Sequence, residues 1–261
     1  MSQPKSKKAR SKKDLQIIHM NELLTNNRAA INDGPSRKKY SIHDIKSIKP
    51  MTEPQREMIE SFLMGNNVVA TGSSGTGKSY LSLWLALSAI LSKEEAQEQL
   101  IIVRSAVPTR DIGFLPGSAE EKLEPYEAPY RDIINELLNN EHAYDNLKEI
   151  GKIKFIPTSF LRGLSWDNSI IFIDEIQSCT LHELSTVITR AGMNTRIIAI
   201  GDSLQNDLIY KKNDQSGIAQ FVNIAKNMKE FDTINFTRND IVRSQLVKSW
   251  ICAYEDEMNI R

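Results

Sequence analysis

A lysine and a serine close a glycine-rich stretch whose spacing is suited to holding a chain of phosphates. Residues 72–79 read Gly-Ser-Ser-Gly-Thr-Gly-Lys-Ser, which fits the pattern G-x-x-x-x-G-K-[ST] of a P-loop. Glycines allow the main chain to come close enough to phosphate oxygens for its N–H groups to donate to them. Lys78 would reach the β- and γ-phosphates, and the hydroxyl of Ser79 would coordinate Mg²⁺. Together with the residue that follows, the pattern predicts these nucleotide-binding residues: Gly72, Ser73, Ser74, Gly75, Thr76, Gly77, Lys78, Ser79 and Tyr80.

The residues on both sides of this loop have the patterns that a P-loop requires. A short β-branched run, Val68-Val69, precedes the loop, and an apolar run from Tyr80 to Leu91 follows it. The order of strand, loop and helix also brings the positive N-terminal end of a helix to the anion site. The bare pattern arises by chance in roughly one sequence of this length in a hundred. Because the flanking runs agree with it, we expect this stretch to bind a nucleoside triphosphate.

Two adjacent carboxylates follow a second apolar run and are suited to metal binding and general-base chemistry. Residues 169–173 read as a buried strand that ends in Asp174 and Glu175, the shape of a Walker B strand. Asp174 would hold the Mg²⁺ that Ser79 also contacts, and Glu175 would polarise the water that attacks the γ-phosphate. A strand that ends at a solvated turn has the same pattern. The position of the pair downstream of a P-loop favours the metal-binding interpretation.

Further polar residues follow other apolar runs, at the edge where open parallel sheets bind ligands. Gln205 comes shortly after the run that ends in Gly201-Asp202, where it could sense the γ-phosphate. The alternative there is a glycine turn followed by a helix N-cap. Arg238 and Arg243 follow the last apolar run and are either surface arginines or phosphate contacts. These patterns leave both interpretations open.

Helix signals stand between the apolar runs. Thr52 is expected to begin one helix as its N-cap, with Gln55 at the third position of a capping box. A helical segment over 119–147 is expected to be interrupted by its prolines, Pro125 and Pro129. The closing helix has an apolar side that we expect to pack on the core, made by Leu246, Val247, Trp250 and Ile251.

The alternation of strands and helices predicts the fold class. Six strands are expected near 67–71, 100–103, 153–156, 170–173, 196–200 and 232–236. Strands that alternate with helices form a parallel sheet with helices on both faces. We therefore expect an α/β fold, with a single domain over residues 50–261 behind a flexible arm over residues 1–49.

The neutral net charge of the chain conceals an asymmetry. Residues 1–49 hold twelve Lys and Arg against four acids, a net of +8, which leaves −8 on the rest because the whole chain is neutral. This basic arm could bind nucleic acid, dock on an acidic neighbouring subunit, or remain a solvated tail. No run of eighteen apolar residues and no signal peptide is present, and two cysteines fit a reducing compartment. We expect a cytoplasmic protein with no membrane contact.

With these residues in view, the body of the chain resembles the PhoH-like family of P-loop ATPases. This family is related to the first RecA-like domain of superfamily 1 helicases. The resemblance covers roughly residues 50–256, with its most specific motifs at 113–117 and 240–244. Its motifs, in the family's order, are Gly72–Ser79, Gly113–Gly117 with Glu121-Lys122 and Pro125-Tyr126, Phe160–Gly163, Asp174–Gln177, Gly201–Gln205 and Asp240–Ser244.

The resemblance implies a RecA-like ATPase that uses ATP and Mg²⁺. Gln55 matches a glutamine that reads the adenine edge, and Gln205 matches a contact to the γ-phosphate. Arg243, and less closely Arg238, match a transition-state arginine that would act on a neighbouring subunit's nucleotide in a ring, expected to be a hexamer. Candidate substrates are RNA and single-stranded DNA; a regulatory scaffold controlled by its nucleotide is the alternative function.

The chain departs from the family pattern in two places. Ile176 and Ser178 stand where the family has Ala and Asn, and the family's Arg-Gly-Arg element ends here in Leu164. The second departure weakens a nucleic-acid or intersubunit contact at that element. The residues before the ATPase body are too few for the ribonuclease domain that some relatives carry, so we expect no nuclease, and the short form suggests a bacteriophage protein.

Overall fold

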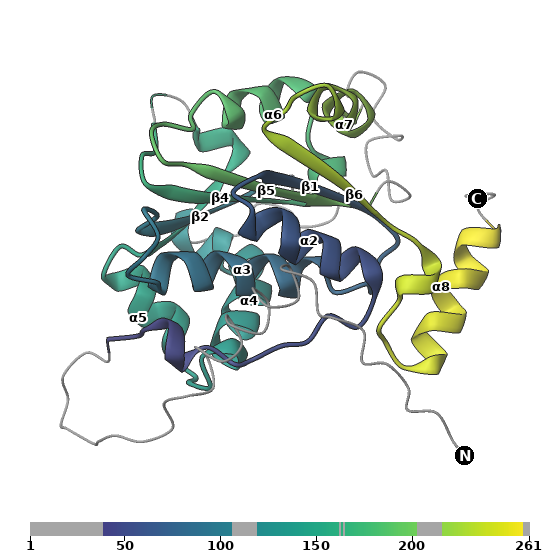
Figure 1. Cartoon of the computed structure of the whole chain (residues 1–261), viewed down its shortest axis with the longest axis horizontal. Coiled ribbons are helices and arrows are strands. Elements are labelled where there is room, and N and C mark those ends of the chain that lie inside the picture. The colour runs from purple at the N-terminus through teal and green to yellow at the C-terminus, as the bar shows by residue number, and fades with distance from the viewer. Residues whose placement is uncertain (1–38, 106–118, 162, 164, 203–215, 258–261) are drawn as a thin grey trace, which may run out of the picture.

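A parallel sheet organises the chain. The computed structural model describes residues 39–105, 119–161, 163, 165–202 and 216–257. Its strands are β1 (Asn67–Gly72), β2 (Gln99–Arg104), β3 (Ile153–Pro157), β4 (Ser169–Asp174), β5 (Arg196–Gly201) and β6 (Phe231–Phe236). They form one six-stranded sheet in the order β3-β2-β4-β5-β1-β6, and every pairing is parallel (Figure 1). The six expected strands and the α/β class are confirmed.

Helices cover both faces of this sheet (Figure 1). One face carries α2 (Glu53–Leu63), α3 (Lys78–Leu91), α4 (Ala119–Leu137) and α5 (Ala143–Glu149). The other carries α6 (Leu181–Ile188) and α7 (Ile218–Lys226). Successive side chains of a strand point to opposite faces, so Ile170 and Phe172 of β4 enter the first core and Ile171 and Ile173 enter the second. No helix in the described parts of the chain is long and apolar enough to cross a bilayer.

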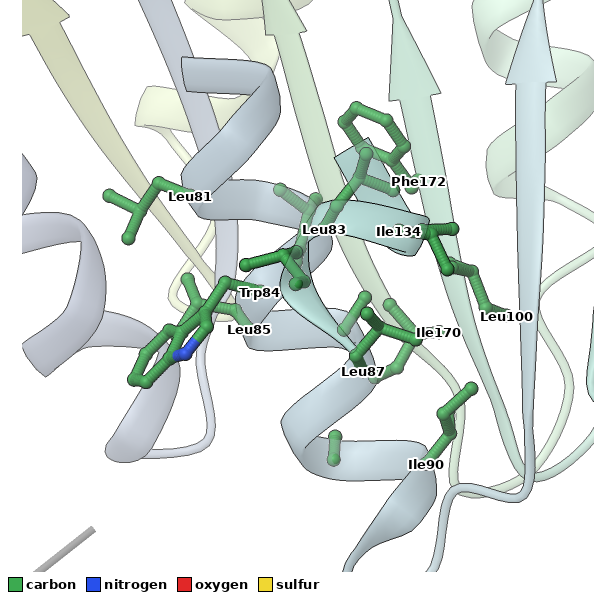
Figure 2. Close-up of a cluster of buried hydrophobic side chains, with 14 of the residues drawn as sticks. Leu81, Leu83, Trp84, Leu85, Leu87, Ile90, Leu100, Ile134, Ile170 and Phe172 are labelled. Atoms are coloured by element: carbon green, nitrogen blue, oxygen red, sulfur yellow. The ribbon is translucent and has the colours of Figure 1, made fainter. Parts of the chain in front are cut away.

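The helix that follows the P-loop is deeply buried in the first core. Figure 2 shows Leu83 and Leu87 of α3 among Leu100, Ile170 and Phe172, which come from β2 and β4. All five side chains are fully buried. Burying side chains of this size stabilises a fold by about 1.5–3 kcal/mol each. This packing fixes the axis of α3, and with it the position of the loop at its N-terminus.

The packed part of the chain begins earlier than residue 50. Tyr40 and Ile45 are buried in the first core. The main-chain N–H of Lys46 donates to the carbonyl of Leu137 at 2.7 Å, and the indole of Trp84 donates to the carbonyl of Lys46 at 3.0 Å. The core therefore takes in residues that precede position 50, and the sequence did not show this because the apolar residues of that stretch give no periodic pattern.

Two helix expectations are also corrected. The first concerns α4, which runs unbroken through Pro125 and Pro129. Both prolines are exposed, so water can satisfy the carbonyl groups that lose their helical donors. The second concerns α8 (Gln245–Glu257), most of whose expected core face is exposed: Leu246 is 80% exposed and Trp250 is 71% exposed, whereas Ile251 lies close to Gly75 of the P-loop. Helical periodicity shows which residues share a face but not what covers that face.

Candidate nucleotide site

The P-loop leaves β1 and turns directly into α3. At its start a Cβ on Gly72 would lie 1.7 Å from the carbonyl oxygen of Phe236, so the close approach of β6 requires a glycine there. The N–H of Ser73 donates to the same carbonyl at 3.2 Å. At its end Gly77, with φ of 83°, is the N-cap residue of α3. The loop is therefore held between β6 and the buried helix.

The side chain of Lys78 curls back into this loop. Its ammonium donates to the carbonyls of Gly72 and Ser73 at 2.8 and 2.7 Å and to the hydroxyl of Thr76 at 3.2 Å. Burial lowers the pKa of Lys78, and the charges of Asp202, Glu175 and Asp174 oppose that shift. All three donors of the ammonium are engaged. A phosphate oxygen would take the place of one of these acceptors.

Gln55 braces the loop from the opposite side. Its amide nitrogen donates to the carbonyl of Thr76 at 2.9 Å, and its amide oxygen accepts from the N–H of Met51 at 2.7 Å. The expected capping box is wrong, because the hydroxyl of Thr52 makes no cap bond and is buried without a partner. Both ends of the amide are engaged within the protein. The adenine-reading role of Gln55 stays a prediction.

The carboxylate of Asp174 is held by two donors at the end of β4. Its Oδ2 accepts from the hydroxyl of Tyr130 at 2.8 Å, and its Oδ1 accepts from the N–H of Glu175 at 2.9 Å. Burial and the neighbouring charge of Glu175 raise the pKa of Asp174 to about 6, although the Tyr130 hydrogen bond and the charge of Arg104 act in the opposite direction. Each oxygen keeps a free lone pair. A hydroxyl and a carboxylate are ligands that Mg²⁺ accepts, so Ser79 and Asp174 suit such a site.

The carboxylate of Glu175 is oriented by a glutamine. The amide nitrogen of Gln177 donates to Oε2 of Glu175, and its amide oxygen accepts from the N–H of Asp202 at 3.0 Å. Gln177 is buried, and Glu175 has a left-handed backbone with φ of 55°. A non-glycine residue in that region is uncommon and is found in turns and at functional sites. Asp202, which follows β5, thus holds Gln177, and Gln177 in turn holds the side chain of Glu175, which follows β4.

These groups line one cleft with a volume of about 480 Å³. That size is typical of a small-molecule site. Its lining residues are Ser74, Gly75, Thr76, Gly77, Lys78, Ser79, Tyr80, Arg104, Pro129, Tyr130, Ile133, Glu136, Asp174, Glu175, Ile200, Gly201, Asp202 and Arg243. The structure therefore brings together most residues predicted for the site from distant parts of the chain. Gly72, Ser73 and Gln55 are not among the residues that line the cleft, and Gln205 lies outside the described residues.

The two arginines after β6 have different surroundings. Arg243 lines the cleft, and a Cβ on Gly75 would lie 3.1 Å from its Cγ. Arg238 instead pairs with two carboxylates of α8, Glu255 at 3.1 Å and Asp256 at 2.9 Å. Arg238 is therefore occupied by the terminal helix and not placed at the phosphate loop.

Tyr130 was not singled out from the sequence. It lies on α4 within a helical segment, where an aromatic residue is most often part of a core. Its contact with Asp174 joins residues 44 positions apart. No local signal could have shown that its hydroxyl reaches the cleft. One sequence signal marks Arg104, which is its position at the end of an apolar run. In the sheet Arg104 of β2 pairs with Asp174 of β4, so both stand at the edge that forms the cleft.

The parallel sheet, with a phosphate loop after β1 and paired carboxylates after β4, defines a P-loop NTPase fold and a nucleotide-binding protein. The family model described as PhoH-like protein matches residues 47–255. The chain belongs to the PhoH-like family.

Curated relatives agree over most of this chain. The PhoH-like protein of Bacillus subtilis (strain 168) is 33% identical over 213 residues, which are 81% of this chain and 65% of that protein. Protein PhoH of Escherichia coli (strain K12) is 29% identical over 213 residues, 81% of this chain and 59% of that one. The chain thus spans less than two thirds of the length of these relatives.

Among solved structures the likeness is distant. A chain from "Structural Basis for DNA Unwinding at Forked dsDNA by two coordinating Pif1 helicases" is 14% identical, with a TM-score of 0.34, over 72% of this chain and 43% of that chain.

Proposed function

We propose that the chain is a Mg²⁺-dependent ATPase. One observation carries this proposal: Lys78, Ser79, Asp174 and Glu175 all line a single cleft. A protein that only binds a nucleotide has no need of an oriented general base, whereas Glu175 is held by Gln177. The family membership supports the same chemistry.

Each group has a definite task in this proposal. The main-chain N–H groups of the P-loop and the ammonium of Lys78 bind the phosphates. Ser79 and Asp174 would hold Mg²⁺, which neutralises charge that develops on the phosphate oxygens. Glu175 accepts a proton from the attacking water through the carboxylate oxygen that Gln177 leaves free. Arg243 stabilises the negative charge of the transition state.

The test is ATP hydrolysis by the purified chain beside Glu175→Gln. We expect the variant to bind nucleotide and to lose hydrolysis by a factor of about 10²–10⁴, because the substitution keeps the shape of the side chain but removes the base. The thermal shift on adding nucleotide reports binding independently of turnover. Full activity in the variant would show that another residue is the base.

The finer proposal is that turnover drives movement on RNA or single-stranded DNA in a ring of subunits. The exposed apolar side chains of α8 support assembly, since subunit contacts commonly cover surfaces of this kind. Hydrolysis measured with and without single-stranded nucleic acid separates a motor, which is accelerated, from a scaffold, which is not. A single size equal to one chain in light scattering with nucleotide bound would rule out the ring.

A further inference from the structure

We propose that Tyr130 is a positioning residue that fixes the carboxylate of Asp174 for metal binding. The inference rests on the proposed function, because it gives a supporting partner to the residue that would hold Mg²⁺. Nothing in the local sequence marks Tyr130 for this role. The role follows from the contact that Tyr130 of α4 makes with Asp174 of β4.

The first part of the case is the hydrogen bond itself. The Tyr130 hydroxyl donates to Oδ2 of Asp174 at 2.8 Å, and both side chains are buried, at 1% and 7% exposed. The other oxygen, Oδ1, accepts from the N–H of Glu175 at 2.9 Å. Two donors on the two oxygens stop the carboxylate from rotating. The lone pair that each oxygen keeps then points in a fixed direction, which a metal ligand requires.

The second part is the way in which the tyrosine ring is held. It packs edge-on against Phe172 at 6.0 Å between centroids, and it lies at a tilt of 35° to Phe155 of β3 at 5.9 Å. Phe172 stands two residues before Asp174 on the same face of β4. The hydroxyl therefore takes its position from the strand that carries its acceptor. A phenylalanine at position 130 would keep these ring contacts and remove only the oxygen.

The third part is the direction of the hydrogen bond. A carboxylate oxygen has no proton to donate, so the hydrogen in the 2.8 Å contact is that of the tyrosine hydroxyl. It is thus a donor to the carboxylate. A second α4 ring stands at the same corner, because Arg104 lies 6.0 Å from the ring centroid of Tyr126. Two side chains of α4 therefore contact the side of the cleft that carries Arg104 and Asp174.

A buried tyrosine can also donate to a carboxylate for stability alone, and the chain offers a matched example. Tyr144 of α5 is fully buried, and its hydroxyl donates to Oε2 of Glu127 at 3.0 Å. Neither of these two residues lines the cleft. Tyr144→Phe therefore removes the same kind of bond without touching Asp174. It is the control for Tyr130→Phe.

The experiment measures the affinity of the full chain for a fluorescent ATP analogue, first in EDTA and then over a Mg²⁺ titration. We expect Tyr130→Phe to need about 10–100-fold more Mg²⁺ for half-maximal enhancement of binding, the usual effect of losing a partner of a metal ligand. Its metal-free affinity should equal that of the wild type, because the P-loop is untouched. At saturating Mg²⁺ its kcat should return to within about threefold of the wild type, since Glu175 is unchanged.

Each remaining outcome decides the case. Equal Mg²⁺ dependence in Tyr130→Phe and Tyr144→Phe would overturn the inference and leave the proposed function intact. Absence of any Mg²⁺ effect on nucleotide binding in the wild type would overturn the proposed function and this inference with it. Circular dichroism and urea unfolding of both variants show whether the fold survives. Should Tyr130→Phe fail to fold, Tyr130→Met, which also lacks the donor, takes its place in the same titration.

Discussion

The main-chain N–H of Val242 donates a hydrogen bond of 3.0 Å to the carbonyl oxygen of Gly75. The segment that carries Arg243 is therefore attached to the P-loop of its own chain. A Cβ on Gly75 would also lie 3.2 Å from Cδ1 of Ile251, so α8 packs on the same spot. From the sequence, Arg243 was expected to serve a neighbouring subunit. Its position in the structure favours action on the nucleotide of its own chain.

The first prediction concerns this arginine. Arg243→Ala should lower ATP turnover by a factor on the order of 10³, because the transition-state charge loses a partner. Mixing this variant with Lys78→Ala subunits should not restore turnover if Arg243 acts within its own chain. Restored activity in the mixture would show action across a subunit boundary. Steady-state hydrolysis of the mixture over a range of ratios is the measurement.

Arg238→Ala is the matched control for that experiment. Arg238 lies on the same segment, but its guanidinium pairs with Glu255 and Asp256 of α8. Neither pair lines the cleft, although Glu255 is buried, so removing its partner costs stability and leaves the nucleotide site in place. The variant should therefore keep the wild-type turnover, and a loss as large as that of Arg243→Ala would mean that the segment as a whole had moved.

The second prediction concerns Lys78. Lys78→Met should abolish the nucleotide-dependent rise in melting temperature, because the phosphates lose their charged donor. The free energy of unfolding without nucleotide should change by no more than about 1 kcal/mol, since three lost hydrogen bonds are offset by removing a buried charge. Urea unfolding in the absence of nucleotide checks this part. A much larger loss would show that the lysine holds the empty loop together.

The third prediction follows from the raised pKa of Asp174. Its pKa rises from 3.8 to about 6 in the folded chain, so folding favours the protonated form. The cost of burying the charge is absent below about pH 4, develops between pH 4 and 6 and is complete above pH 6. Asp174→Asn should thus be more stable than the wild type at pH 8 by about 1–2 kcal/mol, after subtracting about 1 kcal/mol for a weakened hydrogen bond.

Urea unfolding without metal at pH 8 and pH 4 measures this difference. At pH 4 the advantage of the asparagine should vanish, because the wild-type carboxyl is then largely neutral. Asp132→Asn, at an exposed aspartate of α4 outside the cleft, serves as the control for the same change of side chain. An equal effect of Asp174→Asn at both pH values would mean that burial does not raise the pKa of Asp174.

The fourth prediction concerns the end of β5. A Cβ on Gly201 would lie 2.6 Å from Cγ1 of Ile176 and 2.7 Å from Oε1 of Gln177. Gly201→Ala should displace Gln177 and release Glu175, which lowers turnover by on the order of 10² while nucleotide binding persists. Gln177→Leu should reproduce this kinetic change, because it removes the same hydrogen bonds. Single-turnover kinetics with separate binding measurements test both variants, and unchanged chemistry in Gln177→Leu would contradict the orienting role.

The sequence by itself determined the parts of the protein that local patterns encode. Strands β1, β2, β4 and β5 were predicted from short apolar runs with polar ends, whereas β3 and β6, at the two edges of the sheet, contain polar residues among their apolar ones. The alternation of strands with helices dictated a parallel sheet. The P-loop and the pair Asp174 and Glu175 were recognisable because their chemistry depends on neighbours in the chain. Residues that follow strands meet at one edge of a parallel sheet, so their convergence on a cleft could also be expected.

Only the tertiary structure decided which distant groups support that site. Tyr130 reaches Asp174 across 44 residues, and Gln55 braces the carbonyl of Thr76 across 21. The packing also places Arg243 beside the P-loop of its own chain and leaves Leu246 and Trp250 of α8 exposed. A periodic pattern specifies the face of an element but not its neighbour, because the neighbour is set by the packing of all elements together.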